Sequence, residues 1–232
     1  MRVGVDVGGT FTDLVAVAPD GGLEIRKVLS TPEDPSIGLF QACDALPPGA
    51  IELLVHGTTI ATNALLERRG CRTVLVTTAG FEDLLWLRRQ DRASLYDLAS
   101  DHPPPLVRRE DVIGVAERSG PDGVITELTD GAVERTVAAV LAARPEAVAV
   151  VFLFAFRHPA HERRVVAALR AVLPHIPIVT SHEVLPVFRE YERCVTTLLN
   201  AYVMPAVSTY VDRLEQRTRD VGIRAPLLLM KS

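Results

Sequence analysis

The amino-acid sequence predicts an α/β protein whose mixed sheet starts with three antiparallel strands and carries flanking helices. Apolar residues alternate with other residues over 3–7, and two further strand patterns follow at 14–18 and 23–29. Short turns rich in glycine separate these segments, as in consecutive hairpins. A strand, a helix and a strand over 51–76 predict a βαβ unit, and the continuous apolar segment 147–154 has the composition of a buried parallel strand.

Composition and charge limit the possible classes of protein. The chain has 232 residues, of which 48% are hydrophobic and 23% are charged, which excludes a disordered or collagen-like chain and predicts one large domain or one and a half. The net charge of −4 gives no general attraction to nucleic acid or to an anionic membrane, so we expect neither as a partner. The nearest basic cluster is Arg88, Arg89 and Arg92, which Asp91 interrupts.

The cysteines and the hydropathy pattern predict a soluble cytoplasmic protein. Cys43, Cys71 and Cys194 are widely spaced and odd in number, which argues against a disulfide framework and a zinc site and favours three buried small hydrophobic residues. The N-terminus lacks the basic and apolar segments of a signal peptide. The longest apolar run, 147–156, is about half of what a membrane-spanning helix needs.

The remaining elements follow from local signals. Residues 80–119 are irregular, and we interpret them as a substrate-facing or interface excursion outside the main sheet. Pro205 predicts a kink or a break in the longest helix. The last strand either docks on a sheet edge or introduces a further unit of a longer natural chain, and we favour the second interpretation. The other predicted elements are helices at 36–45, 58–69, 129–143, 159–173 and 190–221, and strands at 51–55, 73–76, 177–180 and 226–230.

The segment DVGGTFTD at 6–13 carries the sharpest chemical signal. Paired glycines allow backbone N–H groups to approach an anion, threonine hydroxyls add donors, and a carboxylate at a strand end can hold Mg²⁺. A P-loop would need a following lysine, and a dinucleotide fingerprint would run into a helix, whereas a strand follows here. The alternative is a tight hairpin turn with no ligand. The residues that would bind ATP and Mg²⁺ are Asp6, Gly8, Gly9, Thr10, Thr12 and Asp13.

A glycine turn between antiparallel strands, preceded by Asp and followed by Thr, is typical of the actin, sugar-kinase and heat-shock ATPase superfamily. The predicted fold is therefore a ribonuclease-H-like (actin-type ATPase) lobe. Six blocks, in order along the chain, make the sequence similar to the hydantoinase A/5-oxoprolinase family, which includes N-methylhydantoinases and the β subunit of acetone carboxylase. These blocks are TPEDPSIG (31–38), HGTTIATNALLE (56–67), VTTAGFED (76–83), residues 89–98, REYER (189–193) and NAYV (200–203).

This resemblance implies an ATP-dependent hydrolase that opens a cyclic amide, such as a hydantoin or 5-oxoproline, by phosphorylating a ring carbonyl oxygen. It implies a family N-terminal domain at 1–182 and the beginning of a core domain at 183–232. It also implies an oligomer in which ATP lies between two lobes, completed by a second lobe or a companion hydantoinase B-type subunit, since VGGT has no second copy here. Asp6 would orient Mg²⁺, Gly8, Gly9 and Thr10 would cradle phosphate, and Thr12 and Asp13 would support them.

Further candidate residues lie outside the glycine loop. His56, Thr58 and Thr59 stand where a predicted strand meets a helix, an edge that ligands favour, and are candidate catalytic residues. The alternative is helix capping by a threonine with His56 packed. Asn63 would share a helix face with Thr59 and bind substrate.

The irregular stretch offers further substrate ligands, which are Arg89, Arg92 and Asp97. An arginine fork suits a carboxylate or a ring carbonyl, and the alternative is a solvated charged loop. This sequence departs from the family pattern at 86–88 and at 154–155, where the family has a His-Ser pair.

Two charged groups have more ordinary explanations. The spacing of His158, His161 and Glu162 differs from that of a zinc helix, and capping of a helix N-terminus by the acidic residue is the favoured explanation. Helical ion pairs are expected among Glu190, Glu192 and Arg193.

Three other functions remain open. The chain could be a non-catalytic nucleotide-binding or scaffold subunit that docks through Leu227, Leu228 and Leu229, or an acetone carboxylase-like subunit. A sugar kinase would use the same Asp6 loop. No GxSxG motif or cysteine–histidine pairing indicates a nucleophilic hydrolase.

Overall fold

The computed structural model describes residues 1–31, 33–44, 46–97 and 99–230. The predicted helix end at Ala45, the family-block residues Pro32 and Leu98, and Lys231 and Ser232 lie outside the described residues. The chain forms two compact units. Unit 1 comprises Met1–Glu67 and Ala206–Ser232, and unit 2 comprises Arg68–Pro205.

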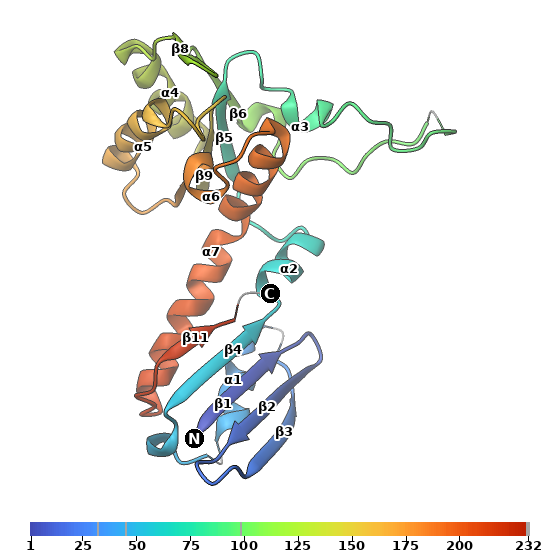
Figure 1. Cartoon of the computed structure of the whole chain (residues 1–232), viewed down its shortest axis with the longest axis vertical. Coiled ribbons are helices and arrows are strands. Elements are labelled where there is room, and N and C mark those ends of the chain that lie inside the picture. Colours follow the sequence, from blue (N-terminus) through green and yellow to red (C-terminus); the bar gives the residue numbers. More distant parts are fainter. Residues whose placement is uncertain (32, 45, 98, 231–232) are drawn as a thin grey trace. The chain divides into compact units, whose positions relative to one another are not determined.

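Unit 1 is a five-stranded mixed sheet with strand order β11-β4-β1-β2-β3 (Figure 1). β2 runs antiparallel to β1 and β3, whereas β4 is parallel to β1 and to β11. This order confirms the predicted ribonuclease-H-like lobe with its antiparallel three-strand start. The elements are β1 (Arg2–Val7), β2 (Phe11–Val17), β3 (Leu23–Leu29), α1 (Pro35–Cys43), the 3₁₀ helix η1 (Pro48–Ala50), β4 (Leu53–Thr58), α2 (Ile60–Leu66), the last part of α7 (Glu190–Asp220) and β11 (Leu227–Leu229).

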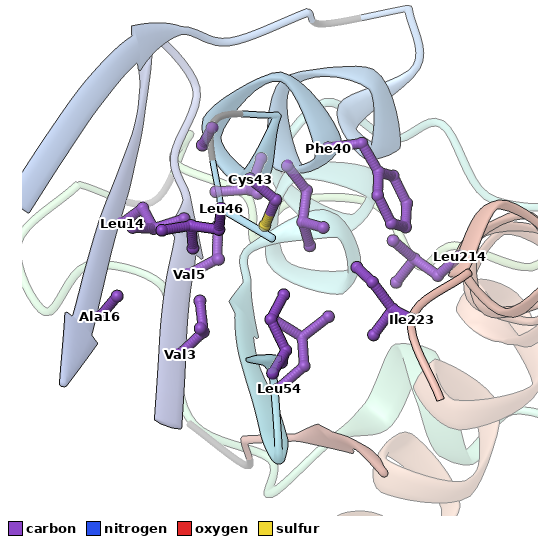
Figure 2. Packing of buried hydrophobic residues seen from close by; sticks show 14 of the residues in the cluster. Val3, Val5, Leu14, Ala16, Phe40, Cys43, Leu46, Leu54, Leu214 and Ile223 are labelled. Atoms are coloured by element: carbon purple, nitrogen blue, oxygen red, sulfur yellow. The ribbon is translucent and has the colours of Figure 1, made fainter. Parts of the chain in front are cut away.

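One face of this sheet carries the core of unit 1. Strand alternation directs Val3 and Val5 of β1, Leu14 of β2 and Leu54 of β4 to the same face. They pack against α1 and the last turns of α7, where Leu214 is fully buried (Figure 2). Helix α1 begins where expected, because Pro35 starts it and the Asp34 carboxylate accepts the Ser36 amide at 3.1 Å.

The opposite face of the sheet exposes apolar side chains of β2 and β3. Both strands alternate, so every second side chain points away from the core. Val15 and Val17 lie directly opposite Ile25 and Leu23, whereas Asp13 and Lys27 separate these four from Phe11 and Leu29. The exposed members are Phe11, Val15, Val17, Leu23, Ile25 and Leu29.

Unit 2 contains a four-stranded parallel sheet with strand order β10-β9-β5-β6 and a separate β7–β8 hairpin. Helices α4 and α5 pack on one face, and α3 and the first half of α7 pack on the other. The prediction of helices on both sides of the sheet is therefore confirmed for unit 2. Its elements are β5 (Thr73–Thr78), α3 (Leu84–Leu87), the 3₁₀ helix η2 (Arg109–Asp111), β6 (Val112–Val115), β7 (Arg118–Gly120), β8 (Gly123–Thr126), α4 (Asp130–Ala143), β9 (Ala147–Val151), α5 (Ala160–Val172), β10 (Ile178–Thr180) and α6 (Ser181–Val184).

Two topological predictions were wrong. The segment 51–76 is not a βαβ unit, because β4 pairs with β1 and β11 in unit 1 whereas β5 pairs with β6 and β9 in unit 2. The segment 80–119 does not lie wholly outside a sheet, since β6 pairs in parallel with β5. In addition, α2 spans only Ile60–Leu66 of the predicted 58–69, because Thr58 belongs to β4.

Helix α7 is one continuous helix through Pro205 and contributes residues to both units. By length and hydropathy alone, an 18-residue window of this helix passes as a membrane span, with 33% of the window buried. A buried stripe that includes Cys194, Leu198 and Ala201 packs on the sheet of unit 2, as a core helix does.

The cysteines follow the expectation for buried small residues, except that Cys71 is only partly buried. Burial raises the pKa of the Cys43 thiol to about 11 and that of the Cys194 thiol to about 12. Both therefore remain protonated and unreactive near neutral pH.

Candidate functional site

The turn between β1 and β2 is closed by its own backbone. The Gly8 amide donates to the Phe11 carbonyl oxygen at 3.0 Å, and a Cβ on Gly8 would lie 3.2 Å from that same oxygen. Gly9 and Thr10 are exposed, and a Cβ on Gly9 would meet nothing within 4 Å. Within the described part of the chain, no acceptor receives the Gly9 or Thr10 amide. The turn therefore presents two backbone donors to solvent, which is the arrangement of an anion-binding nest.

Two carboxylates flank this turn on the sheet face opposite the core. Asp6 and Asp13 are direct cross-strand partners, and their neighbours Val5 and Leu14 point into the core. Like charges directly opposite each other destabilise a strand pair, so this position favours a cation between them. Lys27 Nζ, 3.0 Å from Asp13 Oδ1, neutralises part of this charge.

The absence of a side chain at Gly57 of β4 leaves space for the Asp6 carboxylate. The parallel register places Gly57 beside Asp6, and a Cβ at this glycine would lie 2.8 Å from Asp6 Oδ1. Any larger residue would thus displace the carboxylate or the strand. The glycine of HGTT is therefore part of the same site as DVGGT, although residues 11–55 separate the two motifs in sequence.

Thr12 is not one of the exposed donors. It lies on the core face of β2, fully buried, and its hydroxyl oxygen is 3.0 Å from the Ser30 hydroxyl oxygen. The prediction of a direct contact between this side chain and phosphate is wrong, because β2 begins at Phe11 rather than at residue 14 and alternation turns Thr12 inward. Thr12 instead fixes the end of β3 beneath the turn.

His56 lies on the opposite face of the sheet from Asp6. It is fully buried, with Nδ1 3.2 Å from the Val5 carbonyl oxygen and Nε2 2.6 Å from the Tyr210 hydroxyl. Because a carbonyl only accepts, Nδ1 carries the proton and Nε2 accepts from Tyr210, whose pKa burial raises to about 12. The structure does not bring His56 to Asp6. This agrees with the packed alternative, so the catalytic role predicted for His56 forms no part of the proposal below.

Lowering the pH is expected to destabilise unit 1 through His56. Burial lowers the pKa of His56 below its ordinary value of 6.5, so the unfolded chain takes up the proton more readily than the folded chain. This contribution to stability is complete above pH 6.5 and is lost as the pH falls through the folded-state pKa. Hydrogen exchange of the β1 and β4 amides between pH 5 and 8, corrected for intrinsic rates, measures it.

The variants for this measurement are His56→Gln and, as a control, the exposed His175→Gln. The pH dependence should flatten in the first and persist in the second. A wild-type profile that stays level below pH 6.5 would contradict the assignment.

Thr58, Thr59 and Asn63 are placed by β4 and α2. Thr58 ends β4, and its hydroxyl accepts the Ile60 amide at 3.3 Å. Thr59 is exposed, and its hydroxyl accepts from the Asn63 side-chain amide at 3.2 Å. The shared face predicted for Thr59 and Asn63 is therefore confirmed. Thr59 is the N-cap residue of α2 but makes no side-chain capping hydrogen bond.

The predicted substrate ligands Arg89, Arg92 and Asp97 belong to unit 2 and are exposed. Arg89 is paired with Glu192, and the Asp97 carboxylate accepts the Ala99 amide at 3.0 Å. The structure does not bring the three together as a fork. Their contacts match the alternative of a solvated charged loop.

A buried polar cluster at the carboxyl edge of the unit 2 sheet was not predicted. Glu162 is fully buried and accepts from the Phe152 amide, from the Ser181 hydroxyl, and from the His182 amide and ring Nδ1. Arg193 is 1% exposed and donates to Ser181 Oγ and to the Phe152 and Val187 carbonyl oxygens.

These contacts correct two predictions. Glu162 does not cap α5, because its carboxylate points to the ends of β9 and β10. Arg193 forms no surface ion pair, because it lies on the buried stripe of α7. Nearby, Glu117 accepts from Thr78 and lies 2.7 Å from His161 Nδ1. No group of three metal-ligating side chains occurs among the described residues.

Comparison with known proteins identifies the chain. Residues 2–173 match the model of the hydantoinase/oxoprolinase N-terminal region, and residues 193–232 match the hydantoinase/oxoprolinase model. The chain belongs to the hydantoinase/oxoprolinase family. The predicted domain boundary after residue 182 stays a prediction.

The names of two relatives in this family refer to cyclic amide substrates. The caprolactamase subunit alpha of Pseudomonas jessenii is 34% identical over 244 residues, covering 100% of this chain and 35% of the relative. The 5-oxoprolinase 1 of Arabidopsis thaliana is 29% identical over 272 residues, covering 100% of this chain and 21% of the relative. The chain thus spans about a third or less of these relatives.

Solved structures of the family share the fold. The ATP-dependent caprolactamase of Pseudomonas jessenii superposes with a TM-score of 0.89 at 33% identity, covering 99% of this chain and 35% of that chain. Nucleotide-free acetone carboxylase superposes with a TM-score of 0.88 at 24% identity, covering 99% and 36%. The second match shows the fold alone.

Proposed function

We propose that unit 1 binds Mg-ATP at the β1–β2 turn, as the N-terminal part of an ATP-dependent hydrolase that opens a cyclic amide ring. One observation carries this proposal: paired carboxylates, Asp6 and Asp13, flank a glycine turn whose Gly9 and Thr10 amides are free to bind phosphate. The names of the family relatives, ATP-dependent caprolactamase and 5-oxoprolinase, support the substrate class.

The residues present fit a magnesium nucleotide. Mg²⁺ is held in proteins by one or two carboxylates together with water and phosphate, and Asp6 with Asp13 offers such a pair. The Gly9 and Thr10 amides and the Thr10 hydroxyl would bind phosphate oxygens. Lys27 would neutralise part of the charge on this face. Bound ATP would supply the phosphoryl group that activates a ring carbonyl oxygen toward water.

Turnover is expected to require more polypeptide than these 232 residues. Unit 1 offers one carboxylate-flanked glycine turn, and the relatives that it matches are about three times as long or longer. Several are named as subunits, among them caprolactamase subunit alpha and acetone carboxylase beta subunit. We propose a second lobe or a companion subunit as the partner. The cytoplasmic location stays a prediction.

Calorimetry of the chain with Mg-ATP tests the nucleotide site. Asp6→Asn should weaken binding at least about tenfold, because a charge-assisted metal contact is lost. Gly57→Ala should weaken it similarly by displacing the same carboxylate. In the complete assembly, Asp6→Asn should abolish magnesium-dependent turnover of hydantoins or 5-oxoproline.

The matched control is Asp20→Asn, which removes an equal charge at the β2–β3 turn, at the other end of the same sheet. It should bind Mg-ATP like the unmodified chain. Full affinity in Asp6→Asn would remove Asp6 from the site. ATP consumption that depends on sugars rather than on cyclic amides would replace the hydrolase with a sugar kinase.

A further inference from the structure

Unit 2 contains a small basic pocket that the proposed function does not use. The pocket holds about 160 Å³ and lies between one face of α5 and the end of β10 with the first turn of α6. Its volume is well below the roughly 300–1,000 Å³ of sites for drug-sized ligands, so it suits a small ion or a single functional group. The lining residues are Arg163, Val166, Ala167, Arg170, Thr180, His182 and Glu183.

Two unpaired arginines give this pocket its charge. Arg163 and Arg170 are two turns apart on α5 and therefore share a face of the helix. Within the described ranges, neither guanidinium has a hydrogen bond or an ion pair. Arg163 stands near the helix N-terminus, where a cation is unfavourable. Helix stability therefore does not explain the position of Arg163, although it favours Arg170, which stands in the last turn of α5.

A histidine ring is fixed at the pocket wall by buried structure. The His182 side chain is 9% exposed, and its Nδ1 lies 2.6 Å from the carboxylate of Glu162, which is fully buried. Because Nδ1 donates to a carboxylate, the ring orientation is set. In a neutral ring Nε2 is then an acceptor, which suits the O–H group of a protonated oxyanion. Glu183, the acidic lining residue, already accepts from the Thr180 hydroxyl at 2.7 Å.

We infer that this pocket binds a small oxyanion, with Arg163 and Arg170 as the charged partners and His182 as the positioned polar contact. The planar guanidinium group of arginine matches the oxygens of phosphate and of carboxylate in the same two-point geometry. Either kind of oxyanion would therefore use the same residues of this pocket. Glu162 joins His182 to the ends of β9 and β10, so an occupied pocket would also order the carboxyl edge of the sheet. The inference is independent of the nucleotide site in unit 1.

Titration of the isotopically labelled chain with inorganic phosphate, and separately with acetate, tests this inference by NMR. We expect saturable shifts of the His182 ring and of the α5 and α6 amides, with phosphate bound more tightly because it carries more charge. Arg163→Ala and Arg170→Ala should each weaken phosphate binding at this site about tenfold or more. Both arginines are exposed, so these variants should fold.

Arg135→Ala, an exposed arginine on α4 outside the pocket, is the matched control and should bind like the unmodified chain. Asp6→Asn separates the two sites, because it should leave the His182 shifts unchanged. Shifts that are linear up to high salt, or equal in the Arg163 and control variants, would overturn the inference. Tighter binding of acetate than of phosphate would assign the pocket to carboxylates.

Discussion

Replacing Glu162 with Gln should cost unit 2 about 3–5 kcal/mol of unfolding free energy. The substitution leaves Arg193, which is 1% exposed, without its buried counter-charge, and it places an amide NH₂ among groups that already donate. The Ser181 hydroxyl bridges the two side chains, donating to Glu162 and accepting from Arg193 Nε at 3.2 Å, so the loss spreads through the cluster. Urea unfolding followed by tryptophan fluorescence measures the effect, because the single tryptophan, Trp86, belongs to unit 2.

Glu127→Gln provides the control for this experiment. Its side chain is 81% exposed, and its 3.8 Å contact with His161 Nε2 is a surface pair of the kind that contributes little. We expect its free energy of unfolding to stay within about 0.5 kcal/mol of that of the unmodified chain. A loss below about 1 kcal/mol in Glu162→Gln would mean that water reaches the cluster, against its observed burial.

Leu54→Ala should cost unit 1 about 2–5 kcal/mol, because Leu54 is fully buried at the centre of the β-sheet core. The contrasting variant is Ile25→Ala on the opposite face, where the side chain is 72% exposed. That change should cost little in the isolated chain. Hydrogen exchange of the β1, β2 and β4 amides reports on unit 1 directly and avoids the signal from Trp86 in unit 2.

The two variants also test which face of the sheet is packed. If Ile25→Ala destabilised unit 1 as much as Leu54→Ala, the exposed face would be covered by another molecule in solution. Sedimentation analysis of the unmodified chain would then reveal the association, and equal costs in a monomer would contradict the assigned core.

Local patterns predicted the strands and helices well, but not which sheet each strand joins. The alternation in β1 and β3 and the apolar run of β9 are local signals, and the structure confirms each element. The pairing of β4 with β1 rather than with β5 is decided by contacts between distant segments, which no sequence window contains. For the same reason, the mixed sheet was confirmed while the βαβ unit was wrong.

The candidate site was predicted in part, and its errors have identifiable causes. Asp6 and the glycine turn lie together as expected, whereas Thr12 and His56 point inward because β2 and β4 are longer than predicted. Extending the alternation from Leu54 by two residues would have placed His56 in the core.

The sequence also contained a signal for the buried charged residues of unit 2. Glu162 shares a helical stripe with Val165, Val166 and Leu169, and Arg193 shares one with Ala201. A charge on an apolar stripe indicates a buried, hydrogen-bonded group, and such groups are expected to have partners elsewhere in the fold.

The strand order of unit 1 has a consequence for biosynthesis. β11 pairs with β4 only after the ribosome has synthesised the whole of Arg68–Pro205, which is unit 2. The sheet of unit 1 therefore lacks one strand at the time when the segment that forms unit 2 is already complete. The pairing of β11 with β4 closes a long loop and is therefore late. We expect unit 2 to acquire protease resistance before unit 1 on a stalled nascent chain. The early strands would meanwhile depend on chaperones or on ribosomal shielding to keep their apolar edge from aggregating.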